Sequence, residues 1–419
     1  MYKEYKLDNG LVVALQDTPT KTIAAKLRVN YGSSHENIGE EGLAHFLEHC
    51  LVTGGSEKYD PKTVDEIRGS FAYSNAFCNI GRTNFVGQIL SEDIELWLDC
   101  ASDHAFRPRL DLERVNGERE RVLREISDTK SNSMYPVNVE FNKIFYRDHP
   151  KGRFNLGRED VVRSTNSNDL RRFHSRGFHP NNMDLIIVGG LPENIEEIVG
   201  KYFSDIPVGE NTRKEFPKFK PLRRKITIHK YARERNNTDN PEESSAQIFL
   251  AYLGPSENHK DASAIKTMCH ILGAGTNSFL FQNMGLKKGL AYHVNAVYDG
   301  HYNAGEMQIH AIVPANRIDE SIDVIFEELK KIKTQKVNDN AIESIKKIAK
   351  YDLAKTFESN EGHASEIEHR LDYGLTQEDL FKRYNSVTAE KIMEVANKYL
   401  PDKEYGEYVL YIRDPLKKE

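Results

Sequence analysis

The sequence predicts an α+β protein with two homologous domains, each a mainly antiparallel β-sheet with helices packed on one face. Three observations lead to this fold class. The chain has 419 residues, which is more than a single hydrophobic core usually serves. It begins with segments that alternate like strands and continues with helical patterns. After a stretch rich in Pro, Lys and Arg near residues 205–223, the same order of elements returns, which indicates a divergent duplication.

The first domain is expected to span residues 1–210 and to open with a sheet. An Asn9-Gly10 pair separates two alternating segments, which is a strong signal for a β-hairpin. A further strand pattern runs over residues 23–31 and stops at Gly32. Helical patterns follow at residues 61–69, 91–105, 110–130 and 167–176, with extended segments between residues 73 and 90.

The second domain is expected to span residues 224–419, after a linker at residues 211–223. It repeats the order of elements of the first domain rather than its residues. We expect a strand at 225–230, a polar loop at 232–245, a strand at 246–253 and a helix at 262–272, with more strands and helices up to the end.

Composition narrows the class of protein. The formal net charge is −6 with mixed signs along the chain, so neither a nucleic-acid groove nor an anionic membrane surface is the expected partner. Four cysteines without a Cys-x-x-Cys pair argue against a disulfide framework and against a thiolate zinc site. There is no apolar run of about 18 residues and no targeting pattern at the N-terminus. We therefore expect a soluble, cytoplasmic protein without a membrane-spanning helix.

Within residues 41–50, His45, Glu48 and His49 lie in five consecutive positions, among apolar or small residues. His45 and His49 are four positions apart, so on a helix they share one face and can bind one divalent ion together. Glu48 is three positions from His45 and projects near the same face, where it can hold a water bound to the metal. The alternative is a pair of helical histidines that face solvent or bond to neighbouring carbonyl groups.

A catalytic zinc ion usually has three protein ligands, so a third must come from elsewhere in the chain. In the helix predicted at 110–130, Glu118 and Glu125 share a face with two valines. A carboxylate on an apolar face needs a partner, and either a metal or the imidazole of a metal ligand would supply one. The alternative is a solvated face on which these carboxylates pair with Arg119, Arg121 or Arg124.

With these residues in place, the chain resembles the M16 family of zinc peptidases. These are the inverzincins, named for the order His-x-x-Glu-His, and they include pitrilysin, insulin-degrading enzyme and mitochondrial processing peptidase. The length resembles that of the half-size branch, and the resemblance implies the LuxS/MPP-like metallohydrolase fold. The matching segments are Gly32-Ser33, Gly42 to His49, Asn75 to Phe77, Glu118 to Ile126, Asn155 to Gly157, Pro180 to Met183, Leu272 to Gly275 and Gly289 to Tyr292.

The resemblance implies roles for these residues. His45, His49 and Glu125 would be the zinc ligands, and Glu48 would be the general base of a zinc-dependent endopeptidase that hydrolyses unstructured peptides. Glu118 would orient one of the ligands. The second domain carries no such zinc motif.

Three further residues are assigned to the substrate by resemblance. Asn75 and Ala76 would lie on the strand that pairs with the substrate backbone, and Tyr292 would assist at the scissile bond. The alternatives are a turn residue at Asn75 and a packed strand tyrosine at Tyr292.

The chain departs from the family at Gly285. Seven positions before the tyrosine, active relatives carry an arginine that grips the substrate together with that tyrosine, and this chain has Gly285 there. Lysines 287 and 288 lie nearby but lack the planar guanidinium. The departure favours a dimeric clamshell in which a second M16 subunit supplies the arginine, while a homodimer stays open. A catalytic subunit that is inactive alone, and a non-catalytic structural or peptide-binding homologue, are the alternatives.

Overall fold

The computed structural model describes residues 1–132, 134–210, 226–230, 244–301 and 303–416. It confirms the predicted α+β class. The chain forms two compact units. Unit 1 contains Met1–Val139, Pro150–Glu215 and Thr356–Glu368, and unit 2 contains Glu140–His149, Phe216–Lys355 and His369–Glu419. The predicted linker at 211–223 lies outside the described residues, so the domain boundaries stay a prediction.

Unit 1 contains a six-stranded sheet with the order β1-β2-β6-β3-β5-β4. The predicted hairpin is confirmed, because β1 and β2 pair antiparallel around Asn9-Gly10. Only β2 and β6 run parallel in this sheet, and β4 is its terminal strand. The strands are β1 (Tyr2–Lys6), β2 (Val12–Asp17), β3 (Thr22–Val29), β4 (Tyr73–Cys78), β5 (Thr83–Leu90) and β6 (Met183–Gly189).

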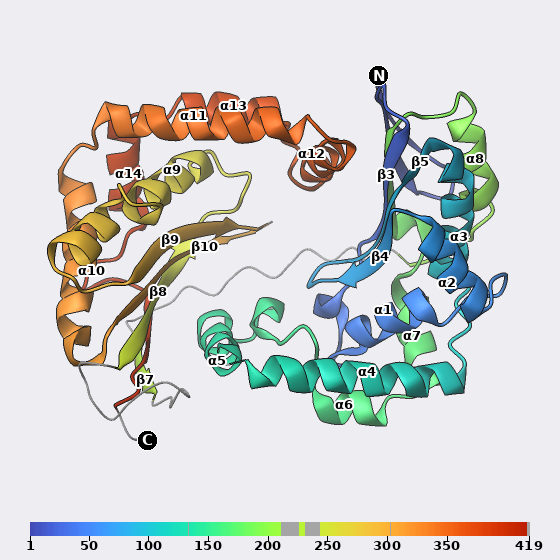
Figure 1. Ribbon diagram of the computed structural model, residues 1–419, viewed down its shortest axis with the longest axis horizontal. Coiled ribbons are helices and arrows are strands. Elements are labelled where there is room, and N and C mark those ends of the chain that lie inside the picture. Colours follow the sequence, from blue (N-terminus) through green and yellow to red (C-terminus); the bar gives the residue numbers. More distant parts are fainter. Residues whose placement is uncertain (133, 211–225, 231–243, 302, 417–419) are drawn as a thin grey trace. The chain divides into compact units, whose positions relative to one another are not determined.

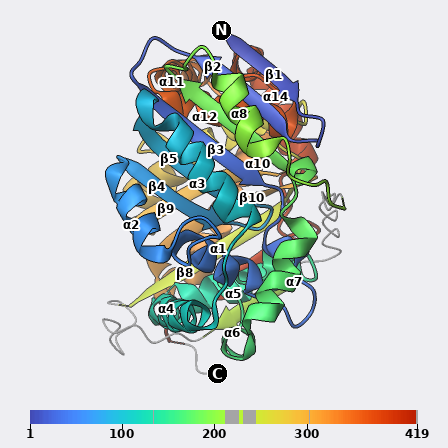
Figure 2. The same ribbon diagram turned by 90° about the vertical axis from the view of Figure 1, so that its right-hand side faces the viewer.

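Helices cover the apolar face of this sheet (Figures 1 and 2). Alternation along β3 turns every second side chain, such as Leu27, into the core that these helices complete. The helix predicted at 91–105 begins three residues late, because residues 91–93 form a separate 3₁₀ turn. The helices of unit 1 are α1 (Leu43–Thr53), α2 (Pro61–Ser70), α3 (Ile94–Phe106), α4 (Leu112–Ser131), α6 (Glu159–Ser164), α7 (Ser167–Gly177) and α8 (Ile195–Phe203).

A segment from near the end of the chain completes the other face of β3. Helix α12 (Asn360–Tyr373) has its first part in unit 1. The Lys26 ammonium lies 2.6 Å from the Glu368 carboxylate, and Arg28 lies 3.8 Å from it. The Asn360 amide donates to the carbonyl oxygen of Thr22 at 2.8 Å. Unit 1 is therefore built from parts of the chain more than 300 residues apart.

Unit 2 contains a five-stranded sheet with the order β7-β11-β8-β10-β9. Its pairs are antiparallel except for β7 with β11. The strands predicted at 225–230 and 246–253 are confirmed to within one residue at either end, whereas most of the loop predicted at 232–245 lies outside the described residues. The strands are β7 (Ile226–Lys230), β8 (Ser245–Gly254), β9 (His293–Gly300), β10 (Gly305–Pro314) and β11 (Val409–Arg413).

Helices pack on the apolar face of the second sheet, to which β8 contributes Ile248, Leu250 and Tyr252 (Figure 1). The opposite face receives the end of helix α5 (Tyr135–Tyr146). In that contact the Tyr411 hydroxyl donates to the Glu140 carboxylate at 2.8 Å. The other helices of unit 2 are α9 (Ala262–Gly273), the π-helix η5 (Phe281–Lys287), α10 (Ile318–Thr334), α11 (Asp339–Thr356), α13 (Gln377–Asn385) and α14 (Ala389–Tyr399).

Candidate metal centre

His45, Glu48 and His49 lie on α1, which is buried on nearly every side. His45 is 6% exposed and Glu48 is 8% exposed, between apolar neighbours. Buried polar groups without partners are costly, so these side chains need an occupant or a partner. The helix is held in place by its contacts with β4 and α4.

The start of α1 is fixed by a carboxyl group from the preceding loop. Glu36 Oε1 accepts from the backbone N–H groups of Gly42 and Ala44, at 3.0 and 2.9 Å. Gly42 adopts a φ of +105°. Its Cα packs against Gly157, and a Cβ added at Gly157 would lie 2.1 Å from the Cα of Gly42. Only glycine allows both the left-handed conformation and this approach. Glu36 and the glycine pair therefore set where the first turn of the histidine helix begins.

Three donor atoms from His45, His49 and Glu125 converge on one point. The two Nε2 atoms are 3.2 Å apart, and Glu125 Oε2 lies 3.5 Å from that of His45 and 3.3 Å from that of His49. Zinc bonds of about 2.0–2.1 Å in tetrahedral geometry separate the ligand atoms by about 3.3 Å. Among the described residues, His45, His49 and Glu125 thus form a group that could hold a metal ion. Their atom types and spacing fit zinc.

Glu118 contacts the outer nitrogen of His49. Its Oε2 lies 3.4 Å from His49 Nδ1, and its other oxygen accepts from the Thr53 hydroxyl at 2.8 Å. Arg121 also lies 3.2 Å from Glu118, so the arginine pairing considered from the sequence is present beside the histidine contact. Burial opposes a charge on His49, but the bond to Glu118 raises its pKa overall. This arrangement directs Nε2 of His49 toward Glu125.

Nδ1 of His45 has a different environment. It is buried and has no hydrogen-bond partner among the described residues. Burial, together with the positive charge of His49, lowers the pKa of His45 to about 3. His45 is therefore held as a neutral imidazole, which is the form that binds metals.

Glu48 lies on the same helix, and its side chain forms no hydrogen bond with another described residue. Burial raises the pKa of its carboxyl group to about 7, while the charge of His49 lowers it and that of Glu125 raises it. A carboxyl group with a pKa near neutrality can exchange a proton in either direction. The site therefore combines three converging donors with one adjacent proton carrier.

Asn75 and Ala76 lie on β4, which packs on α1. Asn75 is exposed and its side-chain amide donates to the Tyr73 hydroxyl at 3.3 Å, whereas Ala76 is buried. β4 pairs only with β5, so its outer edge has no strand partner within the described sheet. Asn75 is a strand residue rather than the turn residue that was the alternative.

Tyr292 and Gly285 belong to unit 2. Tyr292 is 94% exposed, directly before β9, so it is not the packed strand tyrosine that was the alternative. Gly285 lies in the π-helix η5.

Sequence reasoning missed several residues around the centre. Thr53 follows His49 by one helical turn, and that spacing was the available signal for its contact with Glu118. Arg68 on α2 donates to the carbonyl oxygens of Val52 and Ser74, at 3.3 and 3.1 Å, and so connects α1 with β4. Such side-chain contacts to backbone carbonyls leave no pattern in a sequence.

Comparisons with known proteins identify the family of this chain. Residues 11–157 match the model described as "Insulinase (Peptidase family M16)", and residues 164–349 match "Peptidase M16 inactive domain". The chain belongs to peptidase family M16. The M16 resemblance seen in the sequence is thereby confirmed, and the second match covers the half that lacks the histidine motif.

Two curated relatives of this M16 chain cover nearly all of it. The "Uncharacterized zinc protease YmxG" of Bacillus subtilis is 25% identical over 99% of this chain and 98% of its own length. The beta subunit of the mitochondrial-processing peptidase of Saccharomyces cerevisiae is 24% identical over 95% of this chain and 88% of its own length. Several relatives carry zinc in their names, in agreement with the predicted cofactor.

A solved structure shows the same fold. The protease from Helicobacter pylori superimposes with a TM-score of 0.86 at 21% identity, and it covers 99% of both chains. The two-domain M16 architecture predicted from the sequence is therefore confirmed. Within the described part of this M16 chain, every helix is too short or too polar to cross a membrane.

Proposed function

We propose that this M16 chain is a zinc-dependent endopeptidase that hydrolyses unstructured peptides. The observation that carries the proposal is the spacing of the three donor atoms of His45, His49 and Glu125, with Glu48 beside them. A structural zinc site would have four protein ligands, whereas three leave a position for chemistry. The peptidase names of the relatives support the same reaction class.

Each side chain has a distinct role in this proposal. When bound, zinc supplies the Lewis acidity that makes water acidic near neutral pH and polarises a peptide carbonyl. Glu48 takes the proton of the attacking water and returns it to the leaving amine. Glu118 keeps the imidazole of His49 in one orientation, so that Nε2 faces the metal position.

The open edge of β4 supports an extended substrate. An extended peptide can add to this edge through backbone hydrogen bonds, with Asn75 and Ala76 next to it. Such binding makes little demand on sequence and requires a segment that is free of other structure. Unstructured peptides are therefore the expected substrates, and folded proteins are expected to resist cleavage.

The test is cleavage of a mixture of unstructured peptides by the zinc-loaded protein, followed by mass spectrometry. Glu48→Gln is expected to keep its zinc and to lose at least about 100-fold in kcat, because the proton carrier is gone. His45→Ala is expected to lose zinc, measured as metal content after dialysis. A Glu48→Gln variant as active as the parent would remove Glu48 from the mechanism.

We also propose that the chain works as one subunit of a dimer, because Gly285 stands where active relatives have an arginine. A Cβ added at Gly285 would lie 3.4 Å from the Phe281 ring and 3.5 Å from the Ala291 carbonyl oxygen, which are ordinary contacts. Arginine should therefore fit at this position. If the parent is inactive alone, Gly285→Arg is expected to give measurable peptide cleavage by the isolated chain.

Gly285→Met is the matched control, since it adds a long side chain without a guanidinium. Equal activity of the two variants would show that the guanidinium is not what the isolated chain lacks. Full activity of the parent alone would show instead that the glycine is tolerated and that no second subunit has to supply an arginine.

A further inference from the structure

A cavity lies in unit 1 next to the metal centre. It has a volume of about 40 Å³ and is lined by the end of α1, by α2 and α3, and by β4 and β5. Most of its wall is apolar, with the indole of Trp97 on one side. One water needs about 10–15 Å³ of such volume, so the cavity has room for about three heavy atoms.

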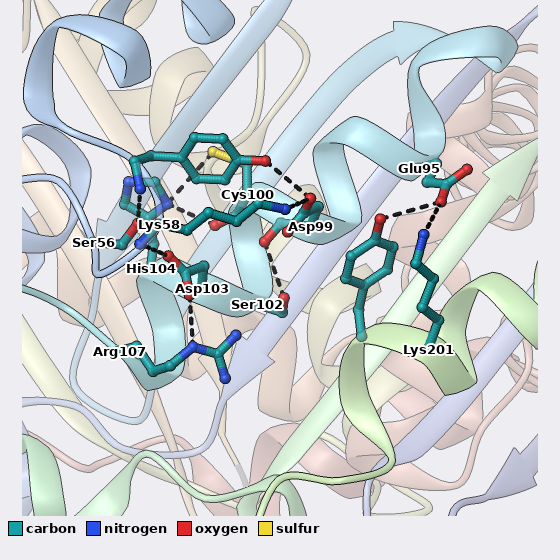
Figure 3. Close-up of polar contacts among 12 residues, drawn as sticks. Ser56, Lys58, Glu95, Asp99, Cys100, Ser102, Asp103, His104, Arg107 and Lys201 are labelled. Carbon is teal, nitrogen blue, oxygen red and sulfur yellow. Dashed lines mark hydrogen bonds and ion pairs between the residues drawn. The ribbon is translucent and has the colours of Figure 1, made fainter.

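His104 lines this cavity and carries a buried nitrogen atom that can accept a hydrogen bond. Its Nδ1 lies 2.6 Å from the carbonyl oxygen of Cys100, and an imidazole nitrogen at that position donates (Figure 3). Nε2 therefore carries a lone pair. The residue is 4% exposed, and Nε2 has no hydrogen-bond partner among the described residues. A group that donates a hydrogen bond is what this atom lacks.

Arg68 contributes a cation to the same cavity. Its guanidinium is tied to Val52 and Ser74 by the two carbonyl contacts described above, and no carboxylate in the described ranges forms an ion pair with it. A guanidinium has five N–H donors, so two carbonyl contacts leave donors for a ligand. An acceptor is what this group lacks.

The wall of the cavity is rigidly supported. The loop between α1 and α2 is tied to α3, because the backbone N–H of Lys58 donates to Asp103 at 2.9 Å and the Lys58 ammonium pairs with Asp99 (Figure 3). Arg107 holds the other Asp103 oxygen at 2.6 Å. The helix that carries His104 is therefore fixed against the loop that follows the histidine helix.

The two polar groups together select one ligand chemistry. A primary carboxamide has an oxygen that accepts from Arg68 and an NH₂ that donates to Nε2 of His104, and it consists of three heavy atoms. A carboxylate would satisfy Arg68 but would place a lone pair against the lone pair of His104. An apolar group would leave both polar groups without a partner.

The source of the carboxamide follows from the strand. The burial of β4 alternates, with Ser74 and Ala76 less exposed than Asn75, and all three residues line the cavity. A peptide added at the edge of β4 would direct every second side chain to the same side. Val52, which lines the cavity, follows Glu48 by about one helical turn on α1.

We propose that this cavity is a specificity pocket that accepts the carboxamide side chain of a peptide substrate, close to the bond that is cleaved. Arg68 binds the amide oxygen and His104 binds the amide nitrogen. The proposal rests on the proposed peptidase function, and it makes Arg68 and His104 specificity-determining residues of that site.

Trp97 allows a test that does not depend on catalysis. It is the single tryptophan of the chain and it lines the cavity. An alanine-based peptide is scanned with one Gln at each position and titrated into the full-length, zinc-loaded Glu48→Gln protein while the tryptophan emission is recorded. At one position, Gln is expected to shift the emission and to bind at least about tenfold more tightly than Met at that position.

Two variants assign the effect to its residues. His104→Phe and Arg68→Met, each combined with Glu48→Gln, are expected to abolish the advantage of Gln over Met while they still bind the Met peptide. Unchanged zinc content and thermal unfolding show that each variant is folded, and Arg68→Lys, which keeps a donor, is expected to retain part of the advantage.

Several outcomes would overturn the pocket. The Gln and Met peptides could bind equally or not at all, or the Glu peptide could bind more tightly than the Gln peptide. Peptide binding without a change in tryptophan emission would show that ordered water, and not a side chain of the peptide, fills the cavity. The cleavage assay separates the two proposals. Peptide hydrolysis without a Gln preference overturns the pocket alone, whereas Gln-selective binding without hydrolysis by either the parent or Gly285→Arg overturns the peptidase alone.

Discussion

Glu118 shows how one side chain connects the two helices of the metal centre. It contacts His49 with one oxygen, while Thr53 and Arg121 contact the other. Burial raises the pKa of a carboxyl group, yet the bonds from His49 and Thr53 hold the pKa of Glu118 below its usual value. The residue is only 3% exposed, so its charge depends on these partners. The orientation of His49 therefore depends on a residue that does not bind the metal.

Removing this carboxylate should weaken metal binding without removing a ligand. Glu118→Ala is expected to lower zinc affinity by about 10–100-fold, because His49 loses the partner that fixes its ring. Competition with a chelator of known affinity measures the change. Glu120→Ala, an exposed glutamate on the same helix, is the matched control and should bind zinc like the parent. An unchanged affinity in Glu118→Ala would mean that α1 alone orients His49.

At the scale of single elements, the histidine helix depends on its first turn. The first N–H groups of a helix have no partner within the helix, and Glu36 satisfies two of them. Because the centre requires donor atoms within a few tenths of an ångström, movement of this turn would displace His45. Capping of α1 is therefore a condition for metal binding as well as for stability.

Glu36→Ala is expected to lower the free energy of unfolding by about 0.5–2 kcal/mol, as the loss of a helix cap does. Glu36→Gln keeps an oxygen that can accept and should lose less. Urea unfolding of the three proteins at fixed zinc concentration measures both. A Glu36→Ala variant as stable as the parent would contradict the capping role.

The difference in stability between the parent and Glu36→Gln is expected to depend on pH. Burial raises the pKa of Glu36 from 4.5 to about 8, although the bonds from Ala44 and Gly42 oppose the shift. As the pH rises, the unfolded chain therefore releases the Glu36 proton at a lower pH than the folded chain does. The free energy of unfolding of the parent should fall as the pH rises from about 4.5 toward about 8. Glutamine cannot ionise, and the stability of Glu36→Gln relative to the parent should therefore rise over this range. A constant difference would show that Glu36 is already charged in the folded protein at low pH.

At the scale of the whole molecule, the two units exchange segments. Unit 1 contains Thr356–Glu368 from late in the chain, and unit 2 contains Glu140–His149 from its first half. Glu368 pairs with Lys26 in unit 1, and Phe141 lies with its ring centre 6.0 Å from that of Phe249 in unit 2. Neither half of the sequence therefore contains a complete unit.

Cutting the chain within residues 211–223 tests this exchange. Fragment 1–210, expressed alone, lacks the α12 segment and should unfold at lower urea than the same fragment co-expressed with 224–419. The co-expressed fragments should purify together. The full-length chain is the reference for stability, and an isolated fragment as stable as the co-expressed pair would show that the exchanged segment contributes little.

The sequence predicts the local features of this molecule well. The hairpin and the histidine helix depend on neighbours two to four residues apart, and such spacings are visible in a sequence. The shared face of Glu118 and Glu125 follows from the period of one helix, and the structure brings Glu125 within 3.5 Å of both histidines. The roles of these residues in catalysis stay predictions.

Contacts between distant segments could not be predicted. The Lys26–Glu368 pair joins residues with no shared pattern, and either side chain alone is typical of a solvated surface. His104 follows Trp97 and Ala101 at helical spacing, which indicates a buried histidine but not a cavity beside it. A pocket arises only where several elements meet, and the way they pack cannot be predicted from the sequence of any single element.

The position of residues 356–368 has a consequence for synthesis of the protein. Chains leave the ribosome from the N-terminus, and domains generally fold as they emerge. Glu368 follows Lys26 of β3 by 342 residues, so all of that chain must be made before this segment can reach β3. We expect the metal-bearing unit to remain incomplete until residues 356–368 have left the ribosome. The helix that carries His45 and His49 would thereby gain its complete unit only after much of the second unit has been made.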